Sequence, residues 1–227
     1  FNVCITPEKL QASIVLFNKG RDLLARMEAL RSARPGAISG ADAFAVAVAG
    51  TVMPREDYTR QLADYLAAVS DRGKSNAPKG QKRLMVLGSI SDDMALIELI
   101  EADGQAVVAA ENLCFGVRHD GHPIQENGDP AAALARGYLG ASTCPRMFGQ
   151  YKARLASVLA AIERGAIDGV VLQNIRFCDL HGSENSLFER DLEAMGIPCL
   201  KIEREYGPLV ETGRIRMRLE AFLERLG

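Results

Sequence analysis

The stretch "DGVVLQNIRFCD", residues 168–179, decides the fold. It starts with the turn dipeptide Asp-Gly, continues through an apolar run, and ends in guanidinium, thiol and carboxylate groups. A short apolar run bounded by turn residues is typical of a strand that is buried on both faces of a parallel sheet. The polar residues that follow are then expected at the carboxyl end of the strand.

Three further stretches have the same character, and helical patterns separate them. We expect strands in "RLMVLGS" (83–89), "QAVVAAENLCFG" (105–116) and "IPCLKIEREYG" (197–207). Helices are expected at residues 94–104, 131–139, 147–164, 184–195 and 210–226, with Ser89 and Asp92 forming a capping box before the first. This alternation predicts an α/β fold, a parallel sheet covered by helices on both faces.

The first third of the chain is expected to be helical. Thr6-Pro7-Glu8 has the features of a helix N-terminus, since Thr6 suits the cap and Pro7 the first helical position. Two more helices are expected near residues 41–52 and 54–69, before a polar linker that includes residues 70–80. We therefore divide the chain into a helical linker segment, 1–80, and an α/β domain, 81–227. Because it opens at Phe1, we expect a piece of a longer protein.

Composition excludes several classes of function. The formal net charge of the 227 residues is −2, which gives no reason to expect a nucleic-acid partner. No apolar run approaches the roughly 18 residues of a membrane span, and no signal peptide is visible. An odd count of five cysteines argues against a disulfide framework. A cytoplasmic protein without membrane contact is expected.

Chemically useful side chains follow each predicted strand. Ligands of parallel α/β sheets bind beyond the carboxyl ends of the strands, so these side chains are expected along one rim. They are Gly88, Ser89 and Ser91; Glu111, Asn112, Cys114 and Arg118; Asn174, Arg176, Cys178, Asp179 and His181; and Glu203, Glu205 and Tyr206.

Three thiols are candidates for metal binding: Cys114, Cys144 and Cys178. Cys144 is placed near a helix start, where the helix dipole lowers a thiol pKa. They are either unrelated buried thiols or ligands of a soft metal site, zinc or iron–sulfur. Their spacings of 30 and 34 residues match no compact zinc module. Cys199, inside a strand, is expected to be a buried small hydrophobe.

Histidines and arginines at the rim leave alternatives open. His119 and His122 are either zinc ligands or surface residues, and His181 either donates a proton or orders Asp179. The side chains of Arg118, Arg146 and Arg176 suit an anion site near a helix N-terminus. Neither a Walker sequence nor a GxGxxG is present, so ATP or NAD binding by this chain is not expected.

Several stretches together resemble subunits of the 2-hydroxyacyl-CoA dehydratase and benzoyl-CoA reductase family. They are "RLMVLGS", "IELIEADGQAVVAAENLCFGVR", "GDPAAALARGYL", "CPRMFGQYKAR", "DGVVLQNIRFCD" and "GIPCLKIEREYG". The ordered pair "LCFGVR" and "RFCD" is quite specific, and "NIRFCDLHGSEN" and "CPRMFG" look closer to the benzoyl-CoA reductase side.

This resemblance implies a fold, a cofactor and partners. Such proteins have two flavodoxin-like halves, an oxygen-sensitive [4Fe-4S] cluster and a homologous second subunit. A separate ATP-hydrolysing iron–sulfur activator supplies a low-potential electron, and the acyl-CoA substrate is reduced to a ketyl radical anion. Family clusters take cysteines from both halves. Cys178 in "RFCD" is the firmest counterpart of a cluster ligand, ahead of Cys114 and Cys144.

Our leading hypothesis is the C-terminal part of an ATP-dependent benzoyl-CoA reductase-type subunit. In it Cys178, Cys114 and Cys144 are the metal ligands, His181 or Glu205 handles protons, and Arg118, Arg176 and Asn174 bind substrate. The nearest alternative is a 2-hydroxyacyl-CoA dehydratase subunit. Two others are a non-catalytic electron-transfer or scaffold subunit and an inert module with structural thiols.

Overall fold

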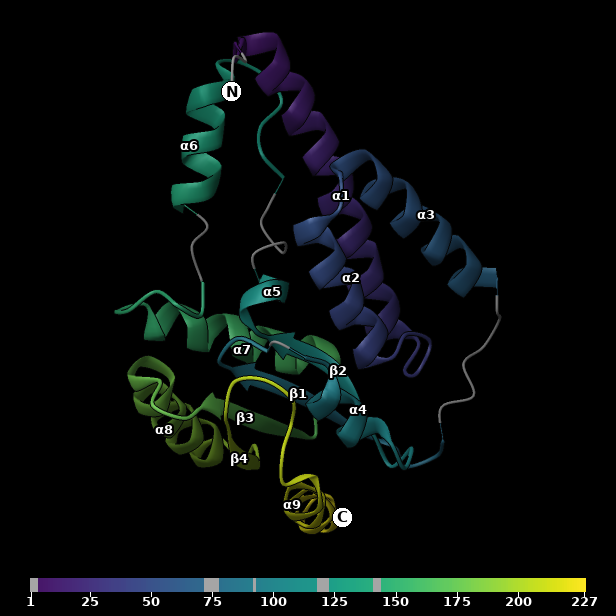
Figure 1. Ribbon diagram of the computed structural model, residues 1–227, viewed down its shortest axis with the longest axis vertical. Helices are drawn as coiled ribbons and strands as arrows, with labels where there is room; N and C mark the ends of the chain where they lie inside the picture. Colours follow the sequence, from purple (N-terminus) through teal and green to yellow (C-terminus); the bar gives the residue numbers. More distant parts are fainter. Residues whose placement is uncertain (1–3, 72–77, 92, 118–122, 141–143) are drawn as a thin grey trace.

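A computed structural model describes residues 4–71, 78–91, 93–117, 123–140 and 144–227 (Figure 1). Within these described ranges four strands form one sheet: β1 (Lys82–Gly88), β2 (Ala106–Asn112), β3 (Gly169–Ile175) and β4 (Cys199–Arg204). The helices are α1 (Pro7–Ala33), α2 (Gly40–Val52), α3 (Arg55–Asp71), α4 (Ala95–Glu101), α5 (Cys114–Val117), α6 (Pro130–Gly140), α7 (Tyr151–Gly165), α8 (Asp179–Ala194) and α9 (Thr212–Arg225).

The sheet has the order β2-β1-β3-β4, and every neighbouring pair is parallel. This confirms the predicted α/β fold. The strand order reverses between β1 and β3, where Val86 faces Val171 in the register. Such a reversal opens a crevice at the carboxyl ends of the two strands, which is the usual ligand position in this class of fold.

Helices cover both faces of the sheet. On one face the apolar side chains of β1 and β2 pack with α2, α4 and α9, for example through Phe44, Ile97 and Phe222. On the other face α7 and α8 pack through Val158 and Phe188, both completely buried. Burial on both sides explains the continuous apolar runs of β1, β2 and β3, whereas the edge strand β4 alternates between buried and more exposed residues.

The predicted helical segment contains α1, α2 and α3, joined by their own core around Leu24, Leu62 and Val69. As expected, Thr6 caps α1, since its hydroxyl accepts from the backbone N–H of Lys9. Figure 1 shows α6 beside the N-terminal end of α1, away from the sheet. The boundary near residue 80 stays a prediction, because α2 also belongs to the core of one sheet face.

Side chains also cover the exposed edge of β2. The guanidinium of Arg31 donates to the carbonyl of Val108 at 2.7 Å, and Glu101 accepts from the backbone N–H of Val108 at 2.9 Å. Glu101 also accepts from the N–H of Gly40 at 2.7 Å. Arg31 of α1 and Glu101 of α4 therefore satisfy backbone groups that an edge strand otherwise leaves open to another chain.

Three local predictions were wrong. Helix α8 begins at Asp179 rather than at residue 184, because Asp179 in the first turn favours a helix start more than the following Gly and Ser oppose it. Helix α7 begins at Tyr151, so Cys144 lies seven residues ahead of it rather than at its start. Helix α4 has no side-chain cap from Ser89, whose hydroxyl instead accepts from the N–H of Ile175; Asp92, the other residue of the predicted capping box, lies outside the described residues.

Across the part of the chain that the structure describes, no helix combines the length and the apolar character needed to cross a bilayer.

Candidate functional site

The carboxyl ends of the strands lie along one rim, and a buried polar network joins three of them. The Gln173 amide donates to the carbonyl of Ser89, and its oxygen accepts from Nε of Arg204 at 3.0 Å. Arg204 also donates to the carbonyl of Ile90 at 2.9 Å. β1, β3 and β4 are therefore fixed relative to one another just where a ligand would bind.

Gly88 permits this close approach. Its φ is +132°, and a Cβ at this position would overlap the carbonyl oxygen of Gln173. That carbonyl also accepts from the amide of Asn185 at 3.1 Å, which brings α8 against the same point. The "LGS" at the end of the first predicted strand is thus a packing requirement rather than a phosphate-binding loop.

A buried cation lies behind the rim. Arg154 of α7 is completely buried; it forms an ion pair with Glu184 and donates to Oδ1 of Asn112 at 3.3 Å. Its guanidinium also lies 5.1 Å from the ring centroid of Phe188. Burial lowers the pKa of Arg154, whereas the negative charges of Glu184 and of the Cys114 and Cys144 side chains in their thiolate form act to raise it.

His181 lies in the first turn of α8, with only 3% of its surface exposed. Burial, followed by the positive charges of Arg154 and Arg146, lowers its pKa from 6.5 to about 4. The ring is therefore neutral near pH 7, which does not favour the proton donor that one interpretation of the sequence suggested; the same low pKa makes the ring a weak base, so a neutral hydrogen-bonding or ligand role fits it better. Its Nδ1 is buried and has no hydrogen-bond partner among the described residues.

The three predicted thiol ligands lie at or near the rim. Cys114 is buried at the start of α5, and Cys144 is partly buried; both lie within the electrostatic range of Arg154. Cys178 is partly buried at the N-cap position of α8. Within the described ranges, no three Cys, His, Asp or Glu side chains gather closely enough to hold a metal ion. Cys114, Cys144 and Cys178, which all belong to the described residues, are therefore not gathered around one point in this structure.

The turn that carries Cys178 is tight and strained. The N–H of Cys178 donates to the carbonyl of Ile175 at 3.0 Å, so only three residues separate β3 from α8. Between them Phe177 adopts φ +65°, a left-handed conformation that costs a bulky residue roughly 1–2 kcal/mol. Its ring is 94% exposed. Strain of this kind concentrates at functional sites.

The predicted substrate-binding residues have different surroundings. Arg176 is exposed and already paired with Glu203 at 3.0 Å and with Glu205 at 2.6 Å. Glu205, the alternative proton-handling residue, is thus paired with Arg176, which was predicted to bind an anionic group of the substrate. Asn174 is partly buried, and its Oδ1 lacks a partner among the described residues. Arg118, His119 and His122 lie outside the residues that the structure describes.

A family model for the D-component of 2-hydroxyglutaryl-CoA dehydratase matches residues 1–226. The chain belongs to this family. The match extends over α1 to α9, so it includes the helical segment as well as the strand ends that carry the candidate thiols.

The similar proteins include a reductase subunit and two dehydratase subunits. The chain is 29% identical over 180 residues, 77% of its length, to a benzoyl-CoA reductase subunit of Thauera aromatica. It is 24% identical over 98% of its length to the (R)-phenyllactyl-CoA dehydratase beta subunit of Clostridium sporogenes, and 20% identical over 99% to the lactoyl-CoA dehydratase beta subunit of Anaerotignum propionicum. The aligned regions span 46%, 58% and 59% of these relatives, about half of their length.

Sequence reasoning missed the cation behind the rim. Arg154 shares one helix face with Val158 and Ile162, at spacings of four residues, and both of these are buried. A charged residue in an apolar stripe is the signal that would have found it, because buried charges need a partner. Its partner Glu184 was assigned to the start of a helix rather than to its second turn.

Proposed function

We propose that this chain is part of an iron–sulfur enzyme subunit that reduces an aromatic acyl-CoA thioester by single-electron steps, as in benzoyl-CoA reductase. The observation that supports this proposal most directly is electrostatic: Cys114 and Cys144 both act on the buried guanidinium of Arg154, and the charge of Arg154 acts on the neutral imidazole of His181. Membership of the dehydratase D-component family and the identity to a benzoyl-CoA reductase subunit support this proposal.

The proposed cofactor is a [4Fe-4S] cluster with Cys178 as the first ligand, followed by Cys114 and Cys144. Thiolate sulfur is the ligand that such clusters use, and a bound cluster supplies electrons one at a time. Because the described residues do not complete a metal site, we propose that further ligands come from outside them. Cys199 is not a proposed ligand. Burial raises the pKa of its thiol to about 12, and its side chain packs in the core rather than at the rim.

Residues of this chain have separate proposed roles. Of the two proposed proton-handling residues, His181 and Glu205, Glu205 is the proposed acceptor, because the pKa of about 4 makes protonation of buried His181 unfavourable near pH 7. Neutral His181 is proposed to hydrogen-bond the substrate through Nδ1, which has no partner among the described residues. Asn174 hydrogen-bonds the substrate, while Arg176 and Arg118 attract its anionic groups. For Arg176 this requires exchange of its contacts with Glu203 and Glu205, which are exposed and therefore weakly held.

A 2-hydroxyacyl-CoA dehydratase subunit is the second candidate. The specific observation in its favour is that both dehydratase subunits align over nearly the whole chain, helical segment included, whereas the reductase subunit aligns over 77%. Either enzyme is proposed to be cytoplasmic and to work with a homologous second subunit and an ATP-hydrolysing iron–sulfur activator.

Product analysis of the intact complex separates the candidates. The complex is purified without oxygen and mixed with its reducing partner, ATP and either benzoyl-CoA or a 2-hydroxyacyl-CoA. A diene thioester supports the reductase and an enoyl thioester the dehydratase. Absence of turnover with both, in a complex that contains iron, would contradict both enzymatic proposals in favour of an electron-transfer subunit.

A further inference from the structure

A cavity of about 590 Å³ lies between the helical segment and the sheet. Its wall comes from α1, α2, β2 and α7, and small side chains keep it open: Ala25, Ala43, Ala47, Ala109 and Ala161. The volume lies within the range of about 300–1,000 Å³ that is typical of small-molecule sites. Of the described thiols at the rim, none lines it.

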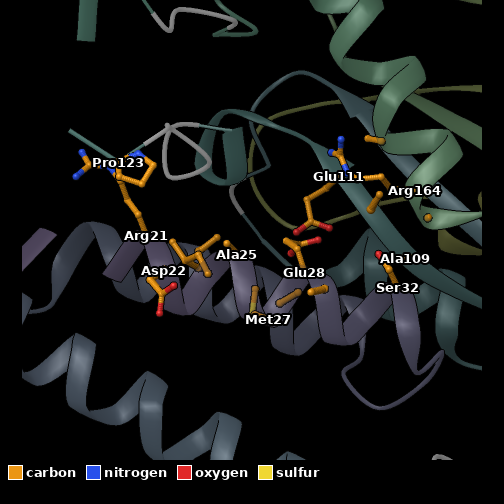
Figure 2. Close-up of a pocket in the computed structure, with 17 residues that line it drawn as sticks. Arg21, Asp22, Ala25, Met27, Glu28, Ser32, Ala109, Glu111, Pro123 and Arg164 are labelled. Carbon is orange, nitrogen blue, oxygen red and sulfur yellow. The ribbon is translucent and has the colours of Figure 1, made fainter. Parts of the chain in front are cut away.

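Two carboxylates share one buried guanidinium at this cavity. Arg31, 3% exposed, donates to Glu28 at 2.9 Å and to both carboxylate oxygens of Glu111, at 3.2 and 3.0 Å. Figure 2 shows the carboxylates of Glu28 and Glu111 pointing toward each other across the space above α1. Glu28 and Glu111 outnumber Arg31 within this group, and the second positive charge at this end of the cavity belongs to Arg164. Burial raises the pKa of Glu28; the charge of Arg31 acts to lower this pKa, and the charge of Glu111 acts to raise it.

An arginine without a carboxylate partner lines the same end. Arg164, in the last turn of α7, forms no ion pair within the described part of the chain, yet its charge acts on Glu28. At the opposite end of the cavity, the guanidinium of Arg21 already has hydrogen-bond partners, because it donates to Asn18 and to the hydroxyl of Tyr138. The two carboxylates would therefore attract a positive group of a ligand, and Arg164, which forms no ion pair with a described residue, would attract a negative one.

We propose that this cavity binds a zwitterionic amino acid with a large apolar side chain. Its ammonium group would lie against Glu28 and Glu111, its carboxylate toward Arg164, and its side chain along the alanine wall toward Leu24 and Met27. An amine without a carboxylate leaves Arg164 unpaired. A carboxylic acid without an ammonium group pairs with Arg164 but is repelled by Glu28 and Glu111. This site is independent of the proposed enzymatic function.

Calorimetric titration of the purified protein with three matched probes tests the proposal. The probes are phenylalanine, phenethylamine, which lacks the carboxylate, and 3-phenylpropanoate, which lacks the ammonium. We expect phenylalanine to bind with a Kd at least tenfold lower than either analogue. Glu28→Gln should weaken phenylalanine about tenfold while leaving 3-phenylpropanoate unchanged or improved, and Arg164→Met should remove the advantage of phenylalanine over phenethylamine.

Matched controls come from exposed residues that do not line the cavity, Glu224→Gln on α9 and Lys152→Met on α7; neither should change the Kd. Ala47→Leu should block binding by filling the wall. Absence of phenylalanine binding, equal binding of 3-phenylpropanoate, or binding that survives both Glu28→Gln and Arg164→Met would overturn the proposal. Iron content and turnover play no part in these readouts, so failure here is distinguishable from failure of the proposed function.

Discussion

Arg154 and Glu184 form an ion pair behind the carboxyl ends of the strands, and Arg154 is fully excluded from solvent. The pair joins α7 to α8, and the field of the same guanidinium reaches Cys114, Cys144 and His181. A buried charge of this kind is costly unless it is paired, so the pair fixes the arrangement of the rim as well as its electrostatics.

Loss of the cation alone should be strongly destabilising. Arg154→Met leaves the carboxylate of Glu184 buried without its partner, and we expect a loss of about 3–5 kcal/mol in the free energy of unfolding. Chemical denaturation monitored by circular dichroism measures it. Arg190→Met, at an exposed pair on α8, should cost less than about 1 kcal/mol. A loss below about 1 kcal/mol for Arg154→Met would show that the ion pair does not hold the rim.

For the strained turn at Phe177 we expect a substitution that does not lower the free energy of unfolding. Phe177→Gly removes an exposed ring and places glycine at φ +65°, so the free energy of unfolding should stay the same or rise by up to about 1 kcal/mol. Phe188→Ala, at a fully buried ring, should cost about 3–5 kcal/mol. Thermal and denaturant unfolding compare them. If Phe177→Gly destabilises by more than about 1 kcal/mol, the turn is not relieved by glycine and the strain argument fails.

Gly88 should not tolerate a side chain. Gly88→Ala brings a methyl group into the carbonyl of Gln173 at a φ of +132°, and we expect loss of folded protein or at least about 3 kcal/mol of stability. Gly213→Ala, in open space on α9, should instead stabilise by about 0.5–1 kcal/mol. Yield and unfolding midpoints of the two variants decide the matter, and an unperturbed Gly88→Ala protein would contradict the described joint between β1 and β3.

His181 predicts a pH dependence with a definite sign. The folded pKa of about 4 lies below the ordinary value of 6.5, so the unfolded chain binds the extra proton first. Stability from this residue is therefore complete above pH 6.5 and falls as the pH drops toward 4, by about 3 kcal/mol in total. The difference between the wild-type protein and His181→Gln isolates this contribution, because the other groups titrate in both. A difference that does not vary between pH 4 and 6.5, or an NMR titration of His181 near 6.5, would refute the buried neutral ring.

The thiols should differ in reactivity. Burial raises the pKa of Cys199 to about 12, whereas Cys4 is exposed near the N-terminus. At a pH of about 8, iodoacetamide should label Cys4 rapidly and leave Cys199 unmodified until the protein unfolds, as peptide mass spectrometry would show. Rapid labelling of Cys199 in the folded protein would place it outside the core.

Much of the fold was predictable because its signals are local. Thr6 and Pro7 define the start of α1, and the apolar run from Val170 to Leu172 is a strand in the structure. The start of α8 was misplaced because Gly182 and Ser183 suggested a loop, although the first turn of a helix tolerates both residues. The rim itself followed from the parallel order of the strands.

The remaining parts of the site depend on long-range contacts. Arg154 meets Asn112 and Glu184 at sequence separations of 42 and 30 residues, and no local pattern specifies that pairing. The Glu28–Arg31–Glu111 group likewise joins α1 to β2 across 80 residues. Periodicity predicts which face of a helix is buried, but it does not specify which element packs against that face.

The central proposal is that Cys178 binds a [4Fe-4S] cluster. Its most direct test is an iron and sulfide assay, joined to an EPR spectrum, of the intact complex purified without oxygen, with Cys178→Ala beside Cys199→Ala. The account predicts about four irons per cluster site in the wild-type complex and in Cys199→Ala, and loss of iron and of the EPR signal in Cys178→Ala. Equal iron content in the two variants, or a wild-type complex that stays iron-free after reconstitution, would contradict it.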